Sequence, residues 1–220
     1  MQRALTLYDT TIGKKAIMAV SGVVYFGFVI GHMLGNLQIY AGAETMNAYA
    51  AFLKATPALL WGTRTVLLIA LVAHVGTSLQ LVLRSNAARG VGYRMQKTVA
   101  TNYAAITMKL SGPILLLFIL FHLAHLTAPG LSLGAAHSAV DVYGNVIAGF
   151  SVPWVVAIYV LAQGALGLHL YHGSWSMLQS VGMSHPRYDA KRKSVARAIA
   201  MAVVIGNISI PLSVLAGVVR

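Results

Sequence analysis

Five long apolar segments constrain this chain more than any other feature of its sequence. About 20 residues are needed for a helix to cross the hydrocarbon core of a bilayer, and each segment is long enough. The segments are residues 16–40, 59–83, 108–128, 152–178 and 198–219. Charged residues make up only 9% of the 220 residues, whereas soluble domains carry about 25%. We therefore predict an all-α integral membrane bundle of five transmembrane helices, forming one domain over residues 1–220, and we exclude an ordinary soluble enzyme.

The basic residues predict the orientation of this bundle. Thirteen of the 16 Lys and Arg residues fall in the N-terminal segment and in the second and fourth connections between spans. The remaining three, Lys54, Arg64 and Arg220, fall on the opposite side. Cytoplasmic loops of membrane proteins are enriched in Lys and Arg. We therefore expect a cytoplasmic N-terminus, and we attribute the pI near 10.2 to topology rather than to nucleic-acid binding.

Prolines and repeats complete the fold prediction. Pro113 and Pro153 are expected in the first turns of their helices, where a missing N–H costs little. Pro211 lies inside the fifth segment, where membrane helices tolerate a kink. The sequence is expected to contain no internal repeat.

Histidines in the spans are the candidate functional residues. The chain has no cysteine, and each of the first four segments carries a histidine past its midpoint: His32, His74, His122 and His169. A single histidine inside a bundle is often a hydrogen-bonded packing residue. However, ionisable residues inside a bilayer are costly and usually functional. Four in consecutive spans therefore favour a shared ligand role over four separate packing roles.

The positions of these four span histidines predict two pairs at two depths. At a rise of about 1.5 Å per residue, each lies roughly 4–8 Å beyond the bilayer centre in the direction of its helix. His32 and His122 then fall in the outer half, whereas His74 and His169 fall in the inner half. Histidine is a usual axial ligand of haem iron, and helix bundles hold cofactors between facing helices. The pattern therefore predicts two bis-histidine b haems stacked across the membrane.

Further residues near the predicted ligands fit this site. His125 and His172 follow two ligands by three residues, so we expect them to hydrogen-bond a ligand or a haem propionate, with plain interfacial histidines as the alternative. Glycines recur in the first helix (Gly27, Gly31, Gly35) and in the fourth (Gly164, Gly167, Gly173). Such stripes let a flat porphyrin approach the backbone, although they serve helix packing equally well.

Four stretches in order along the chain carry a family resemblance. They are residues 31–37, residues 121–125, the pattern His169-x-x-x-Gly173-x-Trp175, and the segment from Glu44 through Asn47 and Tyr49 to Leu60-Trp61. This set resembles the cytochrome b membrane subunit of succinate dehydrogenase, of the five-helix, di-haem type that is similar to the cytochrome b subunit of quinol:fumarate reductases. The likeness covers about residues 12–215. It implies haem ligands at the same four span histidines.

The resemblance also implies a function. The chain would anchor a flavoprotein subunit and an iron–sulfur subunit at the cytoplasmic face of a bacterial membrane, and pass their electrons through two haem b groups to quinone, with menaquinone the expected form. The succinate or fumarate chemistry would occur on a partner subunit. Some fumarate reductases carry a glutamate two residues before the fourth-helix ligand, tied to transmembrane proton movement. That position is Gly167 here, so this proton route is not expected.

Polar residues at both ends of the bundle are candidates for quinone binding and for docking. The outer candidates are Asn36, Glu44, Asn47, Tyr49 and Arg64, and the inner ones are Ser21, Ser78 and Arg84. Glu44 is the only carboxylate of the first outer loop, and its alternative role is an ion pair with Lys54 or Arg64. Basic residues of the segment 84–97 and of the first helix turn are expected to contact the iron–sulfur subunit, and the other basic residues to contact lipid headgroups.

Two other functions fit parts of the sequence. A cytochrome b anchor of another quinone-linked enzyme, such as a hydrogenase or formate dehydrogenase, differs from the leading interpretation only in the motif resemblance. A small transporter with histidine proton relays would require carboxylates inside the spans. All four acidic residues (Asp9, Glu44, Asp141 and Asp189) lie instead in predicted terminal or loop segments, which disfavours the transporter.

Overall fold

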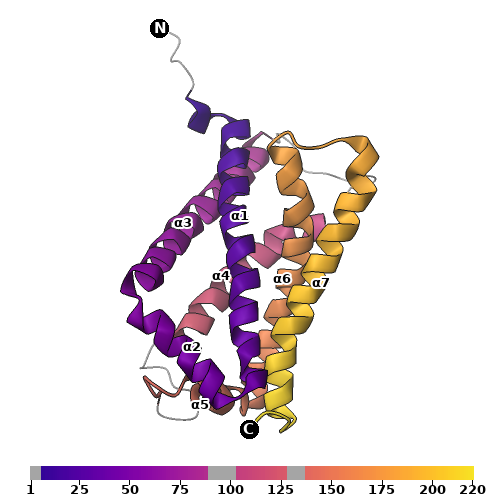
Figure 1. Cartoon of the computed structure of the whole chain (residues 1–220). Helices are drawn as coiled ribbons and strands as arrows, with labels where there is room; N and C mark the ends of the chain where they lie inside the picture. Colours follow the sequence, from indigo (N-terminus) through magenta and orange to yellow (C-terminus); the bar gives the residue numbers. More distant parts are fainter. Residues whose placement is uncertain (1–5, 89–102, 128–136) are drawn as a thin grey trace.

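The computed structural model describes residues 6–88, 103–127 and 137–220, and all regular elements within these ranges are helical. Five long helices run up and down the molecule (Figure 1): α1 (Thr11–Asn36), α3 (Pro57–Ala87), α4 (Tyr103–Leu126), α6 (Pro153–Ser180) and α7 (Asp189–Leu215). The shorter elements are η1 (Leu7–Asp9), η2 (Leu37–Ala41), α2 (Ala43–Ala55), α5 (Val142–Phe150) and η3 (Pro186–Tyr188).

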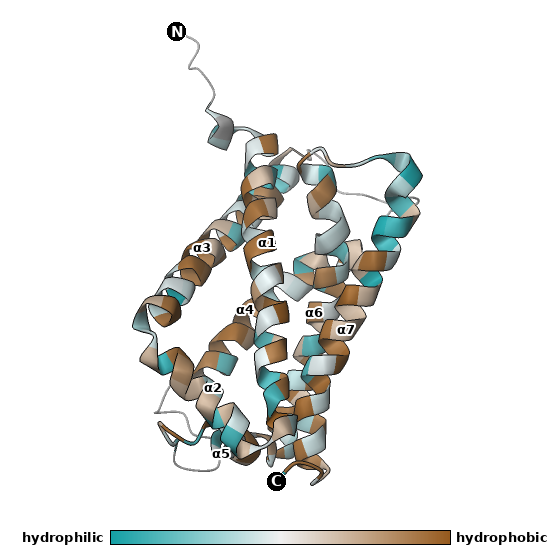
Figure 2. Ribbon diagram, viewed as in Figure 1, coloured by the Kyte–Doolittle hydropathy of each residue, from teal (hydrophilic) through white to brown (hydrophobic). Residues whose placement is uncertain are grey.

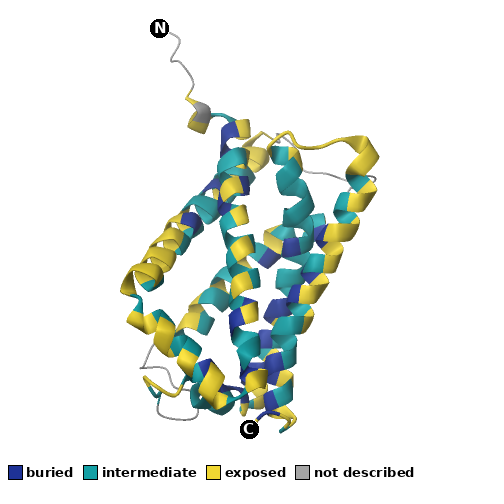
Figure 3. Ribbon diagram, in the orientation of Figure 1, coloured by how far each residue is buried: buried dark blue, intermediate teal, exposed yellow. Residues whose placement is uncertain are grey.

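The five long helices confirm the predicted number of spans. Each is long and apolar enough to cross a membrane, which indicates a multi-pass membrane protein. Their outward faces expose large apolar side chains, such as Leu68, Ile69 and Val72 of α3, as expected for surfaces that meet lipid rather than water. Hydrophilic residues gather instead on the first turns of α7 (Figure 2), and buried residues line the inward faces of the helices (Figure 3).

Several helix boundaries differ from the predicted spans. α7 begins at Asp189 rather than at residue 198. The Asp189 carboxylate forms ion pairs with Arg192 at 2.8 Å and with Lys193 at 2.7 Å, which stabilise the first turns of the helix. The prediction missed these turns because it relied on hydropathy, and the turns are charged. α4 begins at Tyr103, which places Pro113 inside the helix, so the prediction of a first-turn Pro113 is wrong. Pro153 does begin α6, and Pro211 does lie inside α7.

Two helices that the sequence analysis did not predict, α2 and α5, cover one end of the bundle (Figure 1). Gly42, with φ of 95°, turns the chain between η2 and α2, in a conformation that favours glycine. Asn47 of α2 then joins the two helices: its Nδ2 donates to Asp141 Oδ1, and its Oδ1 accepts from the Tyr143 amide, each at 3.0 Å. Lys54 donates to the carbonyl of Ala139.

The packing of the long helices forms a square of four with a fifth outside it. α1 packs against α3 and α6, α4 packs against α6, and α7 packs against α6 from outside. Within the described residues, α1 makes little direct contact with α4, and α3 makes little with α6; the fourth side of the square, between α3 and α4, is also not closed by direct packing. α1 therefore faces α4 across one diagonal, and α3 faces α6 across the other.

The two ends of the bundle are named by the termini. The N-terminal end holds the start of α1, and the C-terminal end holds the chain terminus together with α2 and α5 (Figure 1). Most of the buried core lies near the C-terminal end, where Val155 and Tyr159 of α6 pack against Ile210 of α7 and against α5.

The first prediction concerns the helix cap of α5. Asp141 Oδ1 accepts hydrogen bonds from the Gly144 amide at 2.9 Å and from Asn47, and these bonds, that from Gly144 first, lower the pKa of Asp141 below its ordinary value. We expect Asp141→Ala to speed hydrogen exchange of the α5 amides, because an N-cap acceptor is lost.

The pH dependence of this cap follows from the lowered pKa. Its contribution is complete above the unfolded-state pKa of about 3.9 and is lost as the pH falls through the lower folded-state pKa. Exchange protection of the α5 amides in the unmodified chain should fall over that range. Asp141→Asn is the control, since it retains the cap without the titration. Unchanged exchange in Asp141→Ala would contradict the capping role.

Candidate functional site

The four span histidines meet in two pairs across the diagonals of the helix square. The ring centroids of His32 (α1) and His122 (α4) are 5.7 Å apart, and those of His74 (α3) and His169 (α6) are 6.1 Å apart. These are the pairs that the sequence predicts as ligands of two haems. Their role in binding iron stays a prediction, whereas their proximity is a property of the fold.

The two pairs lie at different levels along the bundle. Ser21 Oγ of α1 is 3.2 Å from His74 Nδ1, and Ser111 Oγ of α4 is 3.2 Å from His169 Nδ1. His32 follows Ser21 by eleven residues, and His122 follows Ser111 by eleven residues. Eleven residues of helix correspond to a rise of about 16 Å. The His74/His169 pair is therefore about 16 Å nearer the N-terminal end than the His32/His122 pair.

The spacing within each pair fits two imidazoles on opposite sides of one metal ion. Each metal–nitrogen bond to imidazole is about 2 Å long, which puts the two ring centroids about 6 Å apart. The ring planes are 87° apart in the His32/His122 pair and 54° apart in the His74/His169 pair. Two axial ligands can rotate about their common axis, so both angles are compatible with coordination.

No group of three or more His, Asp, Glu or Cys side chains that could hold a metal ion occurs within residues 6–88, 103–127 and 137–220. Each histidine pair offers only two protein ligands. A metal ion bound by one pair would take its remaining ligands from outside the pair, as haem iron does from its macrocycle.

Three of the four histidines use the Nδ1 atom for hydrogen bonding within the protein. His74 Nδ1 lies 3.1 Å from the carbonyl oxygen of Met18 in addition to Ser21, and His122 Nδ1 lies 3.1 Å from the Tyr159 hydroxyl. His169 Nδ1 faces Ser111, as given above. Metal-bound histidines usually donate their second ring N–H to such an acceptor. In these three rings the Nε2 atom is thus left for a ligand.

His32 differs from the other three. Its Nε2 lies 3.2 Å from Asn36 Nδ2 one turn later in α1, and its ring stacks on Phe28 with centroids 5.2 Å apart. Coordination through Nε2 requires the Asn36 amide to release this atom. Asn36, a predicted quinone residue, therefore lies against a predicted ligand.

A tyrosine that the sequence analysis did not identify connects two histidines near the C-terminal end. The Tyr159 hydroxyl lies 3.1 Å from His122 Nδ1 and 3.0 Å from His125 Nδ1. Tyr159 and His125 are both only 6% exposed. His125 thus reaches the predicted ligand His122 through Tyr159. The sequence feature that could have identified Tyr159 is its hydroxyl-bearing side chain within an apolar span, ten residues before His169.

Near the N-terminal end, two ring nitrogens of α6 are buried and have no hydrogen-bond partner among the described residues, namely His172 Nδ1 and Trp175 Nε1. The two rings are in edge contact, with centroids 5.2 Å apart, and Lys193 Nζ lies 4.9 Å from the Trp175 ring. Buried polar atoms are normally satisfied, so such orphans indicate a missing polar partner. An acidic group such as a haem propionate fits this position.

The glycines beside the histidines divide into two kinds. A Cβ at Gly35 would lie 3.0 Å from the Tyr49 ring, and one at Gly167 would lie 2.8 Å from Val204, so these glycines allow close helix packing. A Cβ at Gly27, Gly31, Gly164 or Gly173 would meet no atom within 4 Å. In the second kind, Gly27, Gly31 and Gly164 are exposed, so no neighbouring side chain requires glycine there. The contact with Val204 also leaves no room for a glutamate at position 167.

An internal repeat relates the two halves of the site. The pattern Met-x-x-Ser-Gly-x5-Phe-x3-His occurs at residues 18–32 of α1 and again, 90 residues later, at residues 108–122 of α4. The equivalent serines face histidines at the same 3.2 Å distance. The sequence analysis did not single out this short pattern as a repeat. Only five of the fifteen positions are identical. The pattern gains significance because the structure places both of its serines against histidines of one pair.

The outer quinone candidates do not converge on one point. Asn47 holds α5, Tyr49 packs on Gly35, and Arg64 stacks on the Trp61 ring at 4.9 Å. Glu44 is exposed and forms no ion pair with any described residue, so its alternative role as a partner of Lys54 or Arg64 is wrong.

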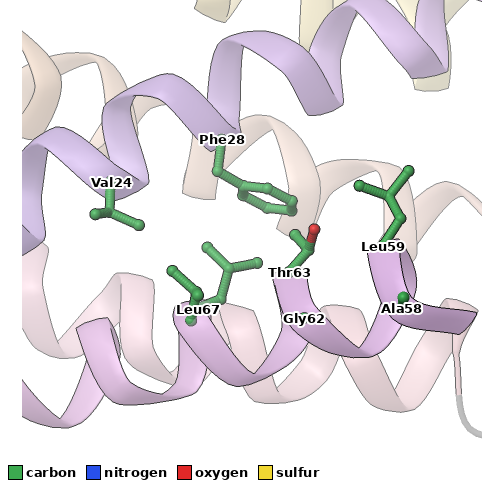
Figure 4. Close-up of a pocket in the computed structure, with 8 residues that line it drawn as sticks. Val24, Phe28, Ala58, Leu59, Gly62, Thr63 and Leu67 are labelled. Carbon is green, nitrogen blue, oxygen red and sulfur yellow. The ribbon is translucent and has the colours of Figure 1, made fainter.

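An apolar hollow of about 480 Å³ lies between α1 and the first turns of α3 (Figure 4). Phe28, whose ring stacks on His32, forms one wall, and Leu59 and Leu67 line the opposite side. The hollow therefore reaches the aromatic ring beside the His32/His122 pair.

The inner candidates also have partners. Ser21 lies against His74, and Arg84 Nη1 donates to the carbonyl of Asp9 at 2.8 Å. Lys14 of the first turn of α1 is only 2% exposed, with its Nζ bonded to Gln80 and 3.8 Å from the Tyr8 ring. Lys14 is therefore inaccessible to a docking partner, whereas Lys15 of the same turn is exposed, so docking at this turn stays a prediction. Arg3, Arg89, Arg94 and Lys97 lie outside the described residues.

No family model, curated protein or solved structure matches the chain. The function is consequently argued from the residues and the geometry above.

The second prediction tests the Tyr159 bridge. Tyr159→Phe removes the hydroxyl that serves both His122 and His125, and leaves two buried ring nitrogens without it. We expect the free energy of unfolding to fall by about 1–2 kcal/mol. This value lies between the average contribution of a hydrogen bond between membrane helices and the cost of leaving a buried polar group without a partner. Equilibrium unfolding in mixed micelles measures this loss. Tyr40→Phe is the control, because its exposed hydroxyl contacts only Ser213. Equal stability of the two variants would contradict the bridge.

Proposed function

We propose that this chain is the cytochrome b membrane-anchor subunit of a succinate:quinone oxidoreductase, a succinate dehydrogenase or fumarate reductase, in a bacterial cytoplasmic membrane. One observation carries the cytochrome b part of the proposal: two histidine pairs with ligand spacing, about 16 Å apart along the bundle, join helices that otherwise make little contact. The motif resemblance supports the choice of enzyme family.

The residues that would hold the cofactors are those already described. His32 and His122 would bind one haem b, and His74 and His169 the other, which would supply one-electron redox chemistry when bound. Ser111 and Tyr159 fix the rings of His169 and His122. His172 and Trp175 would donate to a propionate of the haem at the N-terminal end.

The basic residues support a cytoplasmic N-terminal end. Arg84, Arg187 of η3 and the charged first turns of α7 up to Arg197 lie at that end, together with the start of α1. The flavoprotein and iron–sulfur subunits would dock there. The succinate or fumarate reaction belongs to the flavoprotein partner, and this chain contributes the route between its iron–sulfur neighbour and quinone.

The third prediction is a stoichiometry of two haem b per chain. His74→Ala or His169→Ala should reduce this number to one, because a pair that lacks one imidazole loses an axial ligand. Pyridine haemochrome assay of the purified complex measures the content, and His185→Ala, at an exposed loop histidine, is the control. A content of one haem or none per chain in the unmodified protein would refute the proposal of two haems. If the chain co-purifies with a hydrogenase or a formate dehydrogenase instead of a flavoprotein, the assignment as a cytochrome b subunit stands and the proposed enzyme family is refuted.

The fourth prediction concerns docking of the iron–sulfur subunit. Replacement of Arg84, Arg89 and Arg94 by alanine should cause the complex to dissociate at lower salt than the unmodified complex, because charge pairs at an interface rim are screened by salt. Gel filtration at increasing salt measures the dissociation. Arg220→Ala removes one exposed cation from the opposite end and should have no effect. If the complex that contains the triple variant stays intact at high salt, these arginines affect only the orientation of the chain in the membrane and do not contribute to docking.

The fifth prediction places quinone reduction at the C-terminal end, beside the His32/His122 pair. Glu44 supplies an exposed carboxylate there, able to exchange protons with the outside, and the apolar hollow at Phe28 and Leu59 offers room for an apolar quinone. Glu44→Gln should therefore lower quinone reductase activity at least tenfold with haem content unchanged. Ser78→Ala is the matched variant for the N-terminal end. Full activity in Glu44→Gln, with loss in Ser78→Ala, would move the site to that end.

A further inference from the structure

Two serines occupy equivalent places in the internal repeat, and both face histidines of the same pair. Ser21 of α1 lies against His74 of α3, and Ser111 of α4 lies against His169 of α6, each with 3.2 Å between Oγ and Nδ1. Both serines are buried, at 6% and 3% exposure. In each case the serine belongs to a different helix from the histidine that it contacts.

The hydroxyl hydrogen of Ser21 is used within its own helix. Ser21 Oγ donates to the Ile17 carbonyl at 2.8 Å, whereas the Met108 carbonyl lies 3.4 Å from Ser111 Oγ, farther than His169 Nδ1. The oxygen of Ser21 therefore presents a lone pair to His74. A ring nitrogen that faces a lone pair must carry the hydrogen itself.

A second contact supports this assignment for His74. Its Nδ1 also lies 3.1 Å from the carbonyl oxygen of Met18, which can only accept a hydrogen bond. His74 is thus held with hydrogen on Nδ1 and a lone pair on Nε2. For His169 we assign the same tautomer, because Ser111 occupies the place equivalent to Ser21 and lies at the same distance from Nδ1. This is the form in which a histidine coordinates a metal through Nε2.

We propose that Ser21 and Ser111 are a matched pair of positioning residues that lock His74 and His169 in the Nε2-coordinating tautomer and tune the reduction potential of the haem bound between them. The proposal rests on the proposed function for the presence of that haem. It assigns Ser21 a role through His74, in place of the direct quinone contact that the sequence suggested.

The chemistry predicts the direction of the effect. Donation of the Nδ1 hydrogen to an acceptor makes the imidazole a more basic ligand and stabilises the oxidised metal. Loss of an acceptor should therefore raise the reduction potential. Ser111→Ala should have the larger effect, because His169 Nδ1 has Ser111 as its only hydrogen-bond partner among the described residues, whereas His74 keeps the Met18 carbonyl.

The test is a redox titration of the purified complex, followed by the visible absorption of both haems. Ser21→Ala and Ser111→Ala should each shift upward the same one of the two haem potentials, although the serines lie 90 residues apart on different helices. Ser21→Thr and Ser111→Thr each restore a hydroxyl and should return the potential toward its original value. Ser176→Ala is the matched control on α6, since its hydroxyl bonds only the Gly173 carbonyl.

Several outcomes would overturn the proposal. These are unchanged potentials in both alanine variants, shifts of different haems by the two variants, or an equal shift in Ser176→Ala. Loss of quinone reduction in Ser21→Ala with both potentials unchanged would also refute it, since Ser21 would then act on quinone directly.

A second measurement separates this proposal from the proposed function and does not depend on haem. Nitrogen-15 NMR of the full chain in lipid reports the tautomer of each histidine. His74 and His169 should carry hydrogen on Nδ1, and Ser111→Ala should convert His169 to a mixture of tautomers. If the unmodified chain binds no haem but shows these tautomers, the cytochrome assignment fails and the serine contacts stand. Hydrogen on Nε2 of His74 and His169 would refute the serine role itself.

Discussion

The contact of histidine rings across the two diagonals of the helix square is the interaction on which the rest of this site depends. α1 and α4 make little other contact, and His32 and His122 meet at 5.7 Å between them. Three sides of the square pack directly, α1 against α3 and α6, and α4 against α6. The imidazoles therefore bridge both diagonals of the square, with aromatic rings such as Phe28 and Phe118 packed beside them.

The hydrogen bonds around the rings follow from the low polarity of a membrane interior. A polar atom there has no water to bind, so its partner must come from the protein or from a ligand. Ser21, Ser111 and Tyr159 provide such partners for Nδ1 atoms. His172 and Trp175 have none among the described residues. Ring nitrogens that already have a hydrogen-bond partner in the protein are thus distinguished from those whose partner would come from a bound group.

The sequence predicted the number of spans and the histidine pairs, because both depend on simple one-dimensional quantities. Apolar length identifies a membrane helix, and a residue's offset from the helix midpoint gives its depth. Helix ends were less predictable, since the charged start of α7 is stabilised by pairs with Asp189 that hydropathy does not register. α2 and α5 were missed because amphipathic helices in short connections lack a span's apolar length.

The remaining residues of the site depend on contacts between helices that are distant in sequence. Tyr159 is meaningful only because α6 brings its hydroxyl between His122 and His125. The repeat in α1 and α4 rests on few identical residues, and its two serines gain a role only through their contacts with α3 and α6. The partners of Asn47 and Tyr49 were likewise unpredictable, because they lie on α5 and α1.

The most direct test of the central claim is a cryo-electron microscopy map of the complex purified from its membrane. The account predicts two flat densities inside the bundle, one between His32 and His122 and one between His74 and His169, with centres about 16 Å apart along the helices. Density that joins each pair of rings directly, with no planar group between them, would contradict it.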